Sequence, residues 1–307
     1  MRVMRGTRRR ALPMTMAAGA AALALFAAGC GDDDDEGGGS AATTTTPAEQ
    51  RSFAAGTTMA KLQDAGEIKI GVKYDVPPFG FKNPRSGEIE GFDIDVGKAI
   101  ADELGVRPKF IEAISDNRIP FLKDGTADVI LSTMTINAER DEEIDFSEPY
   151  FIARGRILVK KSNTDINGVD DLAGKNVCTV LGSTYEDTLK KQAPRAKRRL
   201  VDTYSECLDL VQTDAVDAES TDDVILTGHI IQDDSLKLVG EPLTTEPYGA
   251  GIKDGDTAFQ EFINEVLKRF KEDGRWKSTY QKWVGRYTGE DQEPPTMTLQ
   301  EAIDLTK

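Results

Sequence analysis

Histidine and cysteine are scarce in this sequence, whose 307 residues contain one histidine and three cysteines. A His-rich zinc site or a Ser-His-Asp triad is therefore not expected, and we predict no metal, no cofactor and no catalytic residue. A triad would have to use His229, yet no G-x-S-x-G motif frames a serine nucleophile. We expect His229 to be a surface residue near a helix end.

Positive charge is also in short supply. The chain has 38 lysine and arginine residues against 53 aspartate and glutamate residues, which gives a net charge of −15. Five of the arginines lie within residues 2–10, so the rest of the chain is more acidic still. Binding to nucleic acid needs a cationic face for the phosphates, so this class of partner is excluded. An anionic ligand would need local cations to hold it against the overall charge.

The N-terminal hydrophobic run is too short to span a membrane. It covers residues 14–28 and follows a basic stretch, whereas a spanning helix needs about 20 apolar residues. This pattern is typical of a signal peptide, here residues 1–29. The small residues before Cys30 resemble a bacterial lipobox, which would make Cys30 the acylated first residue of the mature protein. A general secretory signal with a chance cysteine is the alternative, and the export route stays open between the general secretory and twin-arginine pathways.

Residues 30–56 follow as a segment of low complexity, with an acidic run, a glycine triplet and a threonine quartet. Such a composition cannot bury apolar surface, so we expect a disordered tether with an end-to-end distance of about 28 Å. Export implies an oxidising compartment, and the two remaining cysteines, Cys178 and Cys207, are expected to form a disulfide. Two buried thiols are the alternative.

From residue 57 the pattern alternates strands and helices, which predicts an α/β fold. Period-two alternation predicts a strand at 67–72, and helical spacing predicts a helix that begins at Asp95 as N-cap and ends at Gly105. An amphipathic helix is expected at 259–270. Residues 288–307 are polar and are expected to form a loose tail with one short helix.

Six short motifs then occur in one order along the chain. They lie at residues 91–96, 117–120, 133–140, 144–150, 171–175 and 182–184. Together they resemble the polar amino-acid substrate-binding proteins of ABC importers, the family-3 extracellular solute-binding group. The resemblance covers about residues 57–287. Within the family, the chain looks most similar to glutamate/aspartate-binding lipoproteins of Gram-positive bacteria, from the stretches 71–75, 182–184 and 203–207 and from Cys178.

The resemblance implies a two-lobe periplasmic-binding-protein (Venus-flytrap) fold with two hinge crossings. Lobe 1 would comprise residues 57–155 plus 246–287, and lobe 2 residues 156–245, with hinges near 154–156 and 244–246. The lobes would close over the ligand by hinge motion. The tail at 288–307 lies outside the strongest resemblance and is assigned no role.

The resemblance also implies roles for residues that meet the two charges of a free amino acid. Arg140 would bind the α-carboxylate as a bidentate fork, aided by Thr133 and Thr135. Asp222 would bind the α-ammonium. Ser183 and Thr184 would supply donors from lobe 2. The alternatives are a solvated helix charge for Arg140 and a helix N-cap for Asp222.

Lys73, Ser115 and Arg118 correspond to the side-chain pocket of dicarboxylate binders. Two cations beyond Arg140 are one too many for a neutral ligand side chain, so we expect a second ligand carboxylate. Tyr204 falls where a dicarboxylate binder uses histidine, which puts equal acceptance of glutamate and aspartate in doubt. Alternatively, Lys73 pairs with Asp75 at the surface.

These observations predict a lipid-anchored substrate-binding subunit of an ABC importer for glutamate or aspartate. The protein would be a monomer outside the cytoplasmic membrane, would deliver its ligand to a permease driven by a separate ATPase, and would catalyse no reaction. A glutamine or asparagine binder is the first alternative. A ligand sensor and an enzyme similar to cyclohexadienyl dehydratases are the others; the enzyme would need a general acid, for which Glu219 is the nearby candidate.

Overall fold

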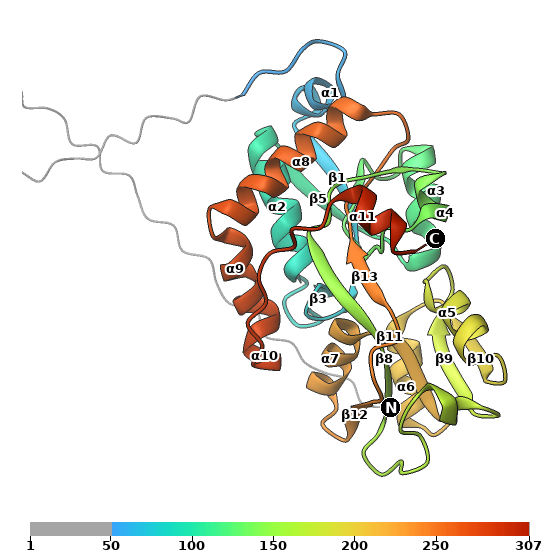
Figure 1. Cartoon of the computed structure of the whole chain (residues 1–307). Coiled ribbons are helices and arrows are strands. Elements are labelled where there is room, and N and C mark those ends of the chain that lie inside the picture. Colours follow the sequence, from blue (N-terminus) through green and yellow to red (C-terminus); the bar gives the residue numbers. More distant parts are fainter. Residues whose placement is uncertain (1–50, 307) are drawn as a thin grey trace, which may run out of the picture. The chain divides into compact units, whose positions relative to one another are not determined.

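The computed structural model describes residues 51–306, which form mixed α/β layers built on two main sheets (Figure 1). The predicted signal peptide, the predicted acylation site Cys30 and most of the predicted tether lie outside the described residues. Within residues 51–306, no helix combines the length and the apolar character needed to cross a membrane.

The first main sheet has the strand order β5-β1-β6-β14-β7. These strands are β1 (Glu67–Val72), β5 (Arg107–Glu112), β6 (Val129–Ile130), β7 (Asp145–Phe146) and β14 (Gly251–Ile252). Strand β1 pairs in parallel with β5 and β6, whereas β14 is antiparallel to β6 and β7. A small sheet accompanies it, made of β2 (Asp75–Val76), β3 (Gly80–Lys82) and β4 (Ile89–Glu90). We call the part of the chain built on these sheets lobe 1.

Most helices of lobe 1 bury apolar residues. The helices of this lobe are α1 (Thr58–Ala65), α2 (Phe92–Leu104), η1 (Ser115–Asn117), α3 (Arg118–Asp124), α4 (Ala138–Asp141), α8 (Thr257–Glu272), α9 (Arg275–Tyr280), η3 (Gln281–Gly285) and α10 (Arg286–Thr288). In α8 every apolar residue at helical spacing from Phe259 to Phe270 is buried, as the sequence pattern predicts.

The second main sheet has the order β10-β9-β11-β8-β12. Its strands are β8 (Phe151–Lys160), β9 (Asn176–Val180), β10 (Lys197–Val201), β11 (Ala218–Asp222) and β12 (Leu236–Val239). The accompanying helices are η2 (Val169–Leu172), α5 (Tyr185–Gln192), α6 (Tyr204–Gln212) and α7 (Asp223–Gln232). We call this part lobe 2.

Two adjacent strands connect the lobes. The first half of β8 pairs with β13 (Thr245–Tyr248), and its second half pairs with β11 and β12 (Figure 1). The chain therefore crosses from lobe 1 to lobe 2 along β8 and returns along β13. The predicted α/β fold with two lobes and two crossings is confirmed; the residue limits of the lobes stay a prediction.

Helix α2 begins earlier than predicted. Its N-cap position is Gly91 and not Asp95, and a Cβ at Gly91 would lie 2.0 Å from the Phe79 carbonyl oxygen, so the helix entry requires glycine. Asp95 lies in the first turn and accepts hydrogen bonds from Lys282 Nζ and Trp283 Nε1, both at 2.8 Å. The predicted end at Gly105 is correct.

Both ends of the described chain pack more closely than predicted. Arg51 pairs with Glu265, and the Phe53 ring lies edge-on to Phe262 at 5.3 Å, so residues 51–56 contact lobe 1 instead of belonging to a free tether. Helix α11 (Leu299–Asp304) opens with a capping box and buries Ala302 in a lobe 1 cluster. The expected short helix is therefore confirmed, but it is not loose, because its apolar face packs in this cluster.

The Cys178–Cys207 disulfide is confirmed, and it ties β9 to α6. Both cysteines are fully buried. In the chain-entropy model, a closed loop of this size stabilises the fold by roughly 3–4 kcal/mol.

We expect the Cys178→Ala/Cys207→Ala double variant to lose about that free energy of unfolding, because its unfolded chain is no longer cross-linked. Urea denaturation of the parent and variant measures the difference. A loss below about 1 kcal/mol would contradict the expected stabilisation.

Candidate functional site

The residues predicted to bind a ligand meet between the two lobes. Hydrogen bonds join Arg118 and Arg140 of lobe 1 to Gly182 of lobe 2, and Lys73 lies beside the ring of Tyr204. Beside them opens a cleft of about 840 Å³, a volume typical of small-molecule sites, lined from lobe 1 by Ser115 and Arg140 and from lobe 2 by residues 182–184.

Lys73 forms the inner cationic point of the site. It directly follows β1, its side chain is 2% exposed, and its ammonium donates to Ser115 Oγ at 3.0 Å and to the Ala113 carbonyl at 3.2 Å. Burial, and next the nearby Arg118 guanidinium, lower the pKa of Lys73 well below its usual value. The alternative of a surface pair with Asp75 is wrong, because Lys73 is buried and Asp75 contacts other groups.

Arg118 opens α3 and uses its guanidinium mainly on backbone carbonyls. It donates to the carbonyls of Ser115, Ser132 and Thr133 at 3.0–3.2 Å, and its Nη2 reaches the Gly182 carbonyl at 3.0 Å. Burial lowers the pKa of Arg118 to about 9, with the Arg140 charge as the next cause. Arg118 therefore fixes the loop that follows β6 and keeps one donor directed at lobe 2.

Arg140 lies on α4, whose first turn is capped by the Asn137 side chain. Its Nη1 donates to the Thr135 carbonyl at 2.7 Å and its Nη2 to the Gly182 carbonyl at 2.9 Å. The residue is buried, which rules out the alternative of a solvated helix charge. Two guanidinium groups thus converge on the Gly182 oxygen, and such paired charged donors suit a carboxylate.

Thr133 is held in an unusual backbone conformation by Asp93. Its φ is 44°, which is uncommon for a non-glycine residue, and its amide donates to Asp93 Oδ2 at 3.0 Å. Tyr150 donates its hydroxyl to Asp93 Oδ1 at 2.7 Å. Burial nevertheless raises the pKa of Asp93 from 3.8 to about 7. Asp93 thus has a structural role, because it holds Thr133 and Tyr150 by hydrogen bonds.

Asp93 should therefore make the stability of the protein depend on pH. Because the folded state raises the pKa of this carboxyl from 3.8 to about 7, the Asp93 contribution is full below about pH 4 and is lost as the pH rises through about 7. In Asp93→Asn this titration is absent. We expect the free energy of unfolding of the parent, minus that of the variant, to fall by roughly 4 kcal/mol between about pH 4 and pH 8.

Urea denaturation of both proteins across this pH range measures the difference. Taking the difference cancels the other titrating groups, which the two proteins share. A difference that stays level with pH would contradict the raised pKa of Asp93.

The anionic side of the site comes from the end of β11. Asp222 is 3% exposed and accepts a hydrogen bond from the Tyr185 hydroxyl at 2.8 Å. Asp222 occupies the N-cap position of α7, as the alternative predicted, but its carboxylate makes no capping hydrogen bond. The carboxylate is therefore not used to cap the helix. Burial, and next the charge of Glu246, raise the pKa of Asp222 well above its usual value. A ligand cation here would favour the ionised form.

Glu246 is the site residue that the sequence reasoning missed. It lies on the crossing strand β13, is 3% exposed, and its Oε2 accepts from Thr135 Oγ1 of lobe 1 at 2.6 Å and from Thr184 Oγ1 at 3.1 Å. In the sequence it is one acid in a hinge segment. A signal that could have found it is its place on the strand that leaves lobe 2, where one side chain can reach both lobes.

The three residues of the loop after β9, Gly182, Ser183 and Thr184, make different contacts at the site. Gly182 has φ of 71°, and a Cβ there would lie 2.8 Å from the Asp116 Cα, so glycine permits the close approach of the lobes. Thr184 joins the site through Glu246. Ser183 also lines the cleft, but its amide and its hydroxyl both donate to the Val180 carbonyl, so its role as a ligand donor stays a prediction. Tyr204 lies at the site, with its ring centroid 5.9 Å from Lys73 Nζ.

His229 is buried and not at the surface, contrary to expectation. Its Nδ1 lies 2.9 Å from Glu219 Oε2. This pair joins α7 to β11 inside lobe 2 and explains why Glu219 is engaged away from the ligand-site residues. Among the described residues, no group of three or more His, Cys, Asp or Glu side chains is arranged to hold a metal ion.

Comparisons with known proteins agree with this geometry. The sequence profile of the "Bacterial extracellular solute-binding proteins, family 3" matches residues 68–286. The chain is 43% identical to the ABC transporter glutamine-binding protein GlnH of Bacillus subtilis over 231 residues, which cover 74% of this chain and 84% of the relative. It is 34% identical to the glutamate-binding protein GluB of Corynebacterium glutamicum over 240 residues, which cover 74% and 80%.

A solved structure is similar as well. An ancestral arginine-binding protein bound to glutamine matches with a TM-score of 0.69 and 40% identity, over 72% of this chain and 98% of that one.

Proposed function

The chain belongs to the bacterial extracellular solute-binding proteins, family 3, and on that premise we propose that it is the binding component of an ABC importer for L-glutamate or L-aspartate. The ligand lies between the lobes and is delivered to a membrane permease powered by a separate ATPase. The observation that carries the acidic specificity is the gathering of three buried cations, Lys73, Arg118 and Arg140, around one site.

These cations repel one another. Burial is the largest cause of the lowered pKa of Lys73, and the positive charges of Arg118 and Arg140 act in the same direction. A ligand with two carboxylates offers these cations a second negative group, whereas the zwitterion of a neutral amino acid offers them one. An amino acid with a second carboxylate is therefore the ligand that the charges favour.

Each ligand group then has partners. Arg140 and the neighbouring Thr135 bind the α-carboxylate, at the point where Arg118 and Arg140 converge. Asp222 binds the α-ammonium, and the nearby charge of Glu246 strengthens the negative potential there. We assign the second carboxylate to Lys73 and Ser115, over which Tyr204 closes from lobe 2.

Glutamine is the second candidate ligand, because the Bacillus subtilis relative is a glutamine-binding protein. The structure adds a reason. Most N–H groups of Arg118 donate hydrogen bonds to backbone carbonyls. Lys73 is therefore the main cation that can bind the ligand side chain. A single ammonium can donate to an amide oxygen as well as to a carboxylate.

We further propose that the protein acts as a monomer and is held at the outer face of the cytoplasmic membrane by acylated Cys30. It performs no catalysis in this account. An enzyme would need a general acid directed at the ligand, and Glu219 is bonded to His229 within lobe 2.

The test is uptake of radiolabelled glutamate by a strain that lacks this gene. Restoring the parent gene should restore uptake, and restoring the Arg140→Ala gene should not, although immunoblotting shows equal amounts of both proteins. Excess unlabelled aspartate should compete, and excess glutamine should compete poorly. Equal uptake with and without the gene would contradict the importer role, and stronger competition by glutamine would favour the second candidate.

A further inference from the structure

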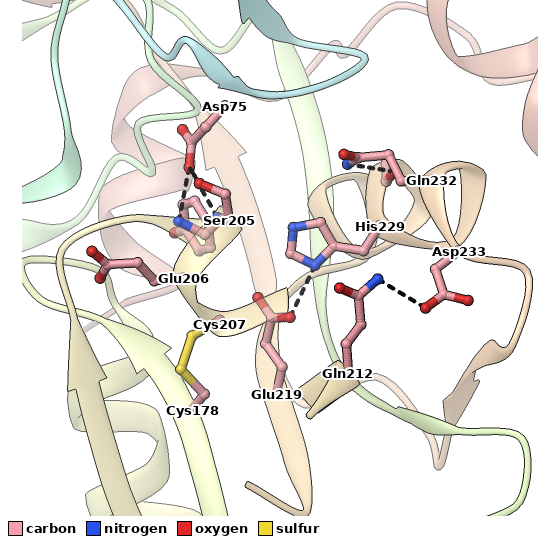
Figure 2. Close-up of polar contacts among 12 residues, drawn as sticks. Asp75, Cys178, Ser205, Glu206, Cys207, Gln212, Glu219, His229, Gln232 and Asp233 are labelled. Atoms are coloured by element: carbon pink, nitrogen blue, oxygen red, sulfur yellow. Dashed lines mark hydrogen bonds and ion pairs between the residues drawn. A yellow bond between two sulfur atoms is a disulfide. The ribbon is translucent and has the colours of Figure 1, made fainter. Parts of the chain in front are cut away.

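A short segment of lobe 1 reaches into lobe 2 beside the ligand site. We name it the 75–77 clamp, after Asp75, Val76 and Pro77. Asp75 Oδ2 accepts hydrogen bonds from the amides of Tyr204 and Ser205 at 2.9 and 3.1 Å. Figure 2 shows Asp75 directed at Ser205. The Ser205 hydroxyl lies 3.4 Å from the same oxygen. A lobe 1 carboxylate therefore contacts the first residues of α6 in lobe 2.

The Asp75 contact completes the helix N-terminus. The first amides of an α-helix have no partner within the helix, and their partial positive charge favours an anion. In α6 the Thr203 hydroxyl accepts from the Glu206 amide, as an N-cap does. The two preceding amides, of Tyr204 and Ser205, are satisfied by Asp75 from the other lobe. Opening the lobes would therefore return both amides and the carboxylate to water.

Pro77 makes the second contact of the clamp, with α7. A Cβ at Gly228 would lie 1.7 Å from the Pro77 carbonyl oxygen, so the clamp touches the bare helix backbone there. Helix α7 offers a firm surface, because His229 next to this glycine is bonded to Glu219 on β11 (Figure 2).

The clamp acts on a residue of the proposed site. Tyr204 is the first residue of α6, and its ring lies over Lys73. Three residues on, Cys207 ties the same helix to β9 through the disulfide (Figure 2). Helix α6 is thus bonded to its own lobe by the Cys207 disulfide and to lobe 1 by the hydrogen bond from the Tyr204 amide to Asp75.

We propose that the 75–77 clamp holds the lobes together around the ligand, with Asp75 as a positioning residue that acts through Tyr204 and sets how slowly the ligand leaves. This inference rests on the proposed function. None of the proposed ligand contacts involves the clamp, so we expect it to govern dissociation more than association.

The first experiment compares Asp75→Ala and Asp75→Asn with the parent by stopped-flow kinetics with glutamate. Asp75→Ala should raise the dissociation rate constant roughly 10- to 100-fold and change the association rate constant less than about threefold. Asp75→Asn keeps one acceptor oxygen, so its dissociation rate constant should lie between those of the parent and Asp75→Ala. The control is Asp95→Ala, another half-buried carboxylate, which contacts only lobe 1 residues among the described partners.

The second experiment uses a variant whose fold should not suffer. Gly228→Ala replaces a helical glycine, which favours the helix by up to about 1 kcal/mol, but its Cβ meets the Pro77 oxygen. Because the clash falls on the contact between the lobes, we expect each lobe to keep its fold, with an unchanged far-UV circular dichroism spectrum, and the ligand to be released faster. Gly168→Ala is the matched control, because nothing lies within 4 Å of a Cβ there.

Interlobe energy transfer provides a readout that needs no ligand. Dyes on Lys98→Cys and Lys191→Cys, exposed residues of lobe 1 and lobe 2, should report a smaller closed fraction in Asp75→Ala and Gly228→Ala than in the parent. Unchanged closed fractions in both variants would overturn the clamp, whatever the ligand is. Unchanged release rates in both variants would overturn its role in ligand retention. A parent that binds no amino acid would instead overturn the proposed function, while the energy transfer still tests the clamp.

Discussion

Replacing Arg140 with alanine is expected to abolish the binding of every amino acid that the parent protein binds. Each such ligand carries an α-carboxylate, and we assign that group to the Arg140 guanidinium. Truncating one partner of a buried, hydrogen-bonded charge pair costs about 2–5 kcal/mol, which corresponds to a loss of roughly 30- to 5,000-fold in affinity. The loss should be similar for acids and amides, because the α-carboxylate is common to them.

Two control variants separate this effect from general damage. Arg269→Ala removes a partly exposed arginine that pairs with Glu103 within lobe 1, and it should leave affinity unchanged. Arg140→Lys keeps the charge but loses the fork and should recover part of the affinity. Equilibrium dialysis with labelled ligand measures all three variants. Parent-like binding by Arg140→Ala would show that the α-carboxylate lies elsewhere.

Replacing Lys73 with methionine is expected to change selectivity. Methionine is similar in length and carries no charge, so the second ligand carboxylate would lose its cation. We expect glutamate affinity to fall by about 2–4 kcal/mol, or roughly 30- to 1,000-fold, and glutamine affinity to fall less. The ratio of the two dissociation constants should therefore move toward glutamine.

The same variant tests whether burying the Lys73 ammonium costs stability, because it removes a cation whose pKa is lowered by burial and by neighbouring arginines. Its free energy of unfolding without ligand should stay within about 1 kcal/mol of the parent, since the lost hydrogen bonds are offset by relief of desolvation and repulsion. Competition binding gives the selectivity, and urea denaturation the stability. Unchanged glutamate affinity would remove Lys73 from the pocket.

Elements that are marked by a periodic pattern or an ordered set of motifs were predictable from the sequence. Period-two alternation located β1, helical spacing located α8, and the order of short motifs predicted two lobes. The start of α2 was not predictable in this way. Asp95 is a good capping residue by type, but the close approach of Gly91 to the Phe79 carbonyl moves the helix start forward by a turn.

Residues whose roles depend on distant partners were harder to assign. A single histidine after a glycine offers no periodic signal, so the burial of His229 against Glu219 follows only from the packing of α7 on β11. Glu246 gains its position from a crossing strand. Ser183 lines the cleft as its motif predicts, but its donors bond within its own turn, so its ligand contact stays a prediction.

The central claim is that the site between the lobes takes an acidic amino acid. Titration calorimetry on the soluble protein from Gly31 onward, with glutamate, aspartate, glutamine and asparagine at one salt concentration, tests it most directly. We predict that glutamate or aspartate binds at least about 100-fold more tightly than either amide, because three buried cations surround the site. Tighter binding of an amide, or no binding of any of the four, would contradict it.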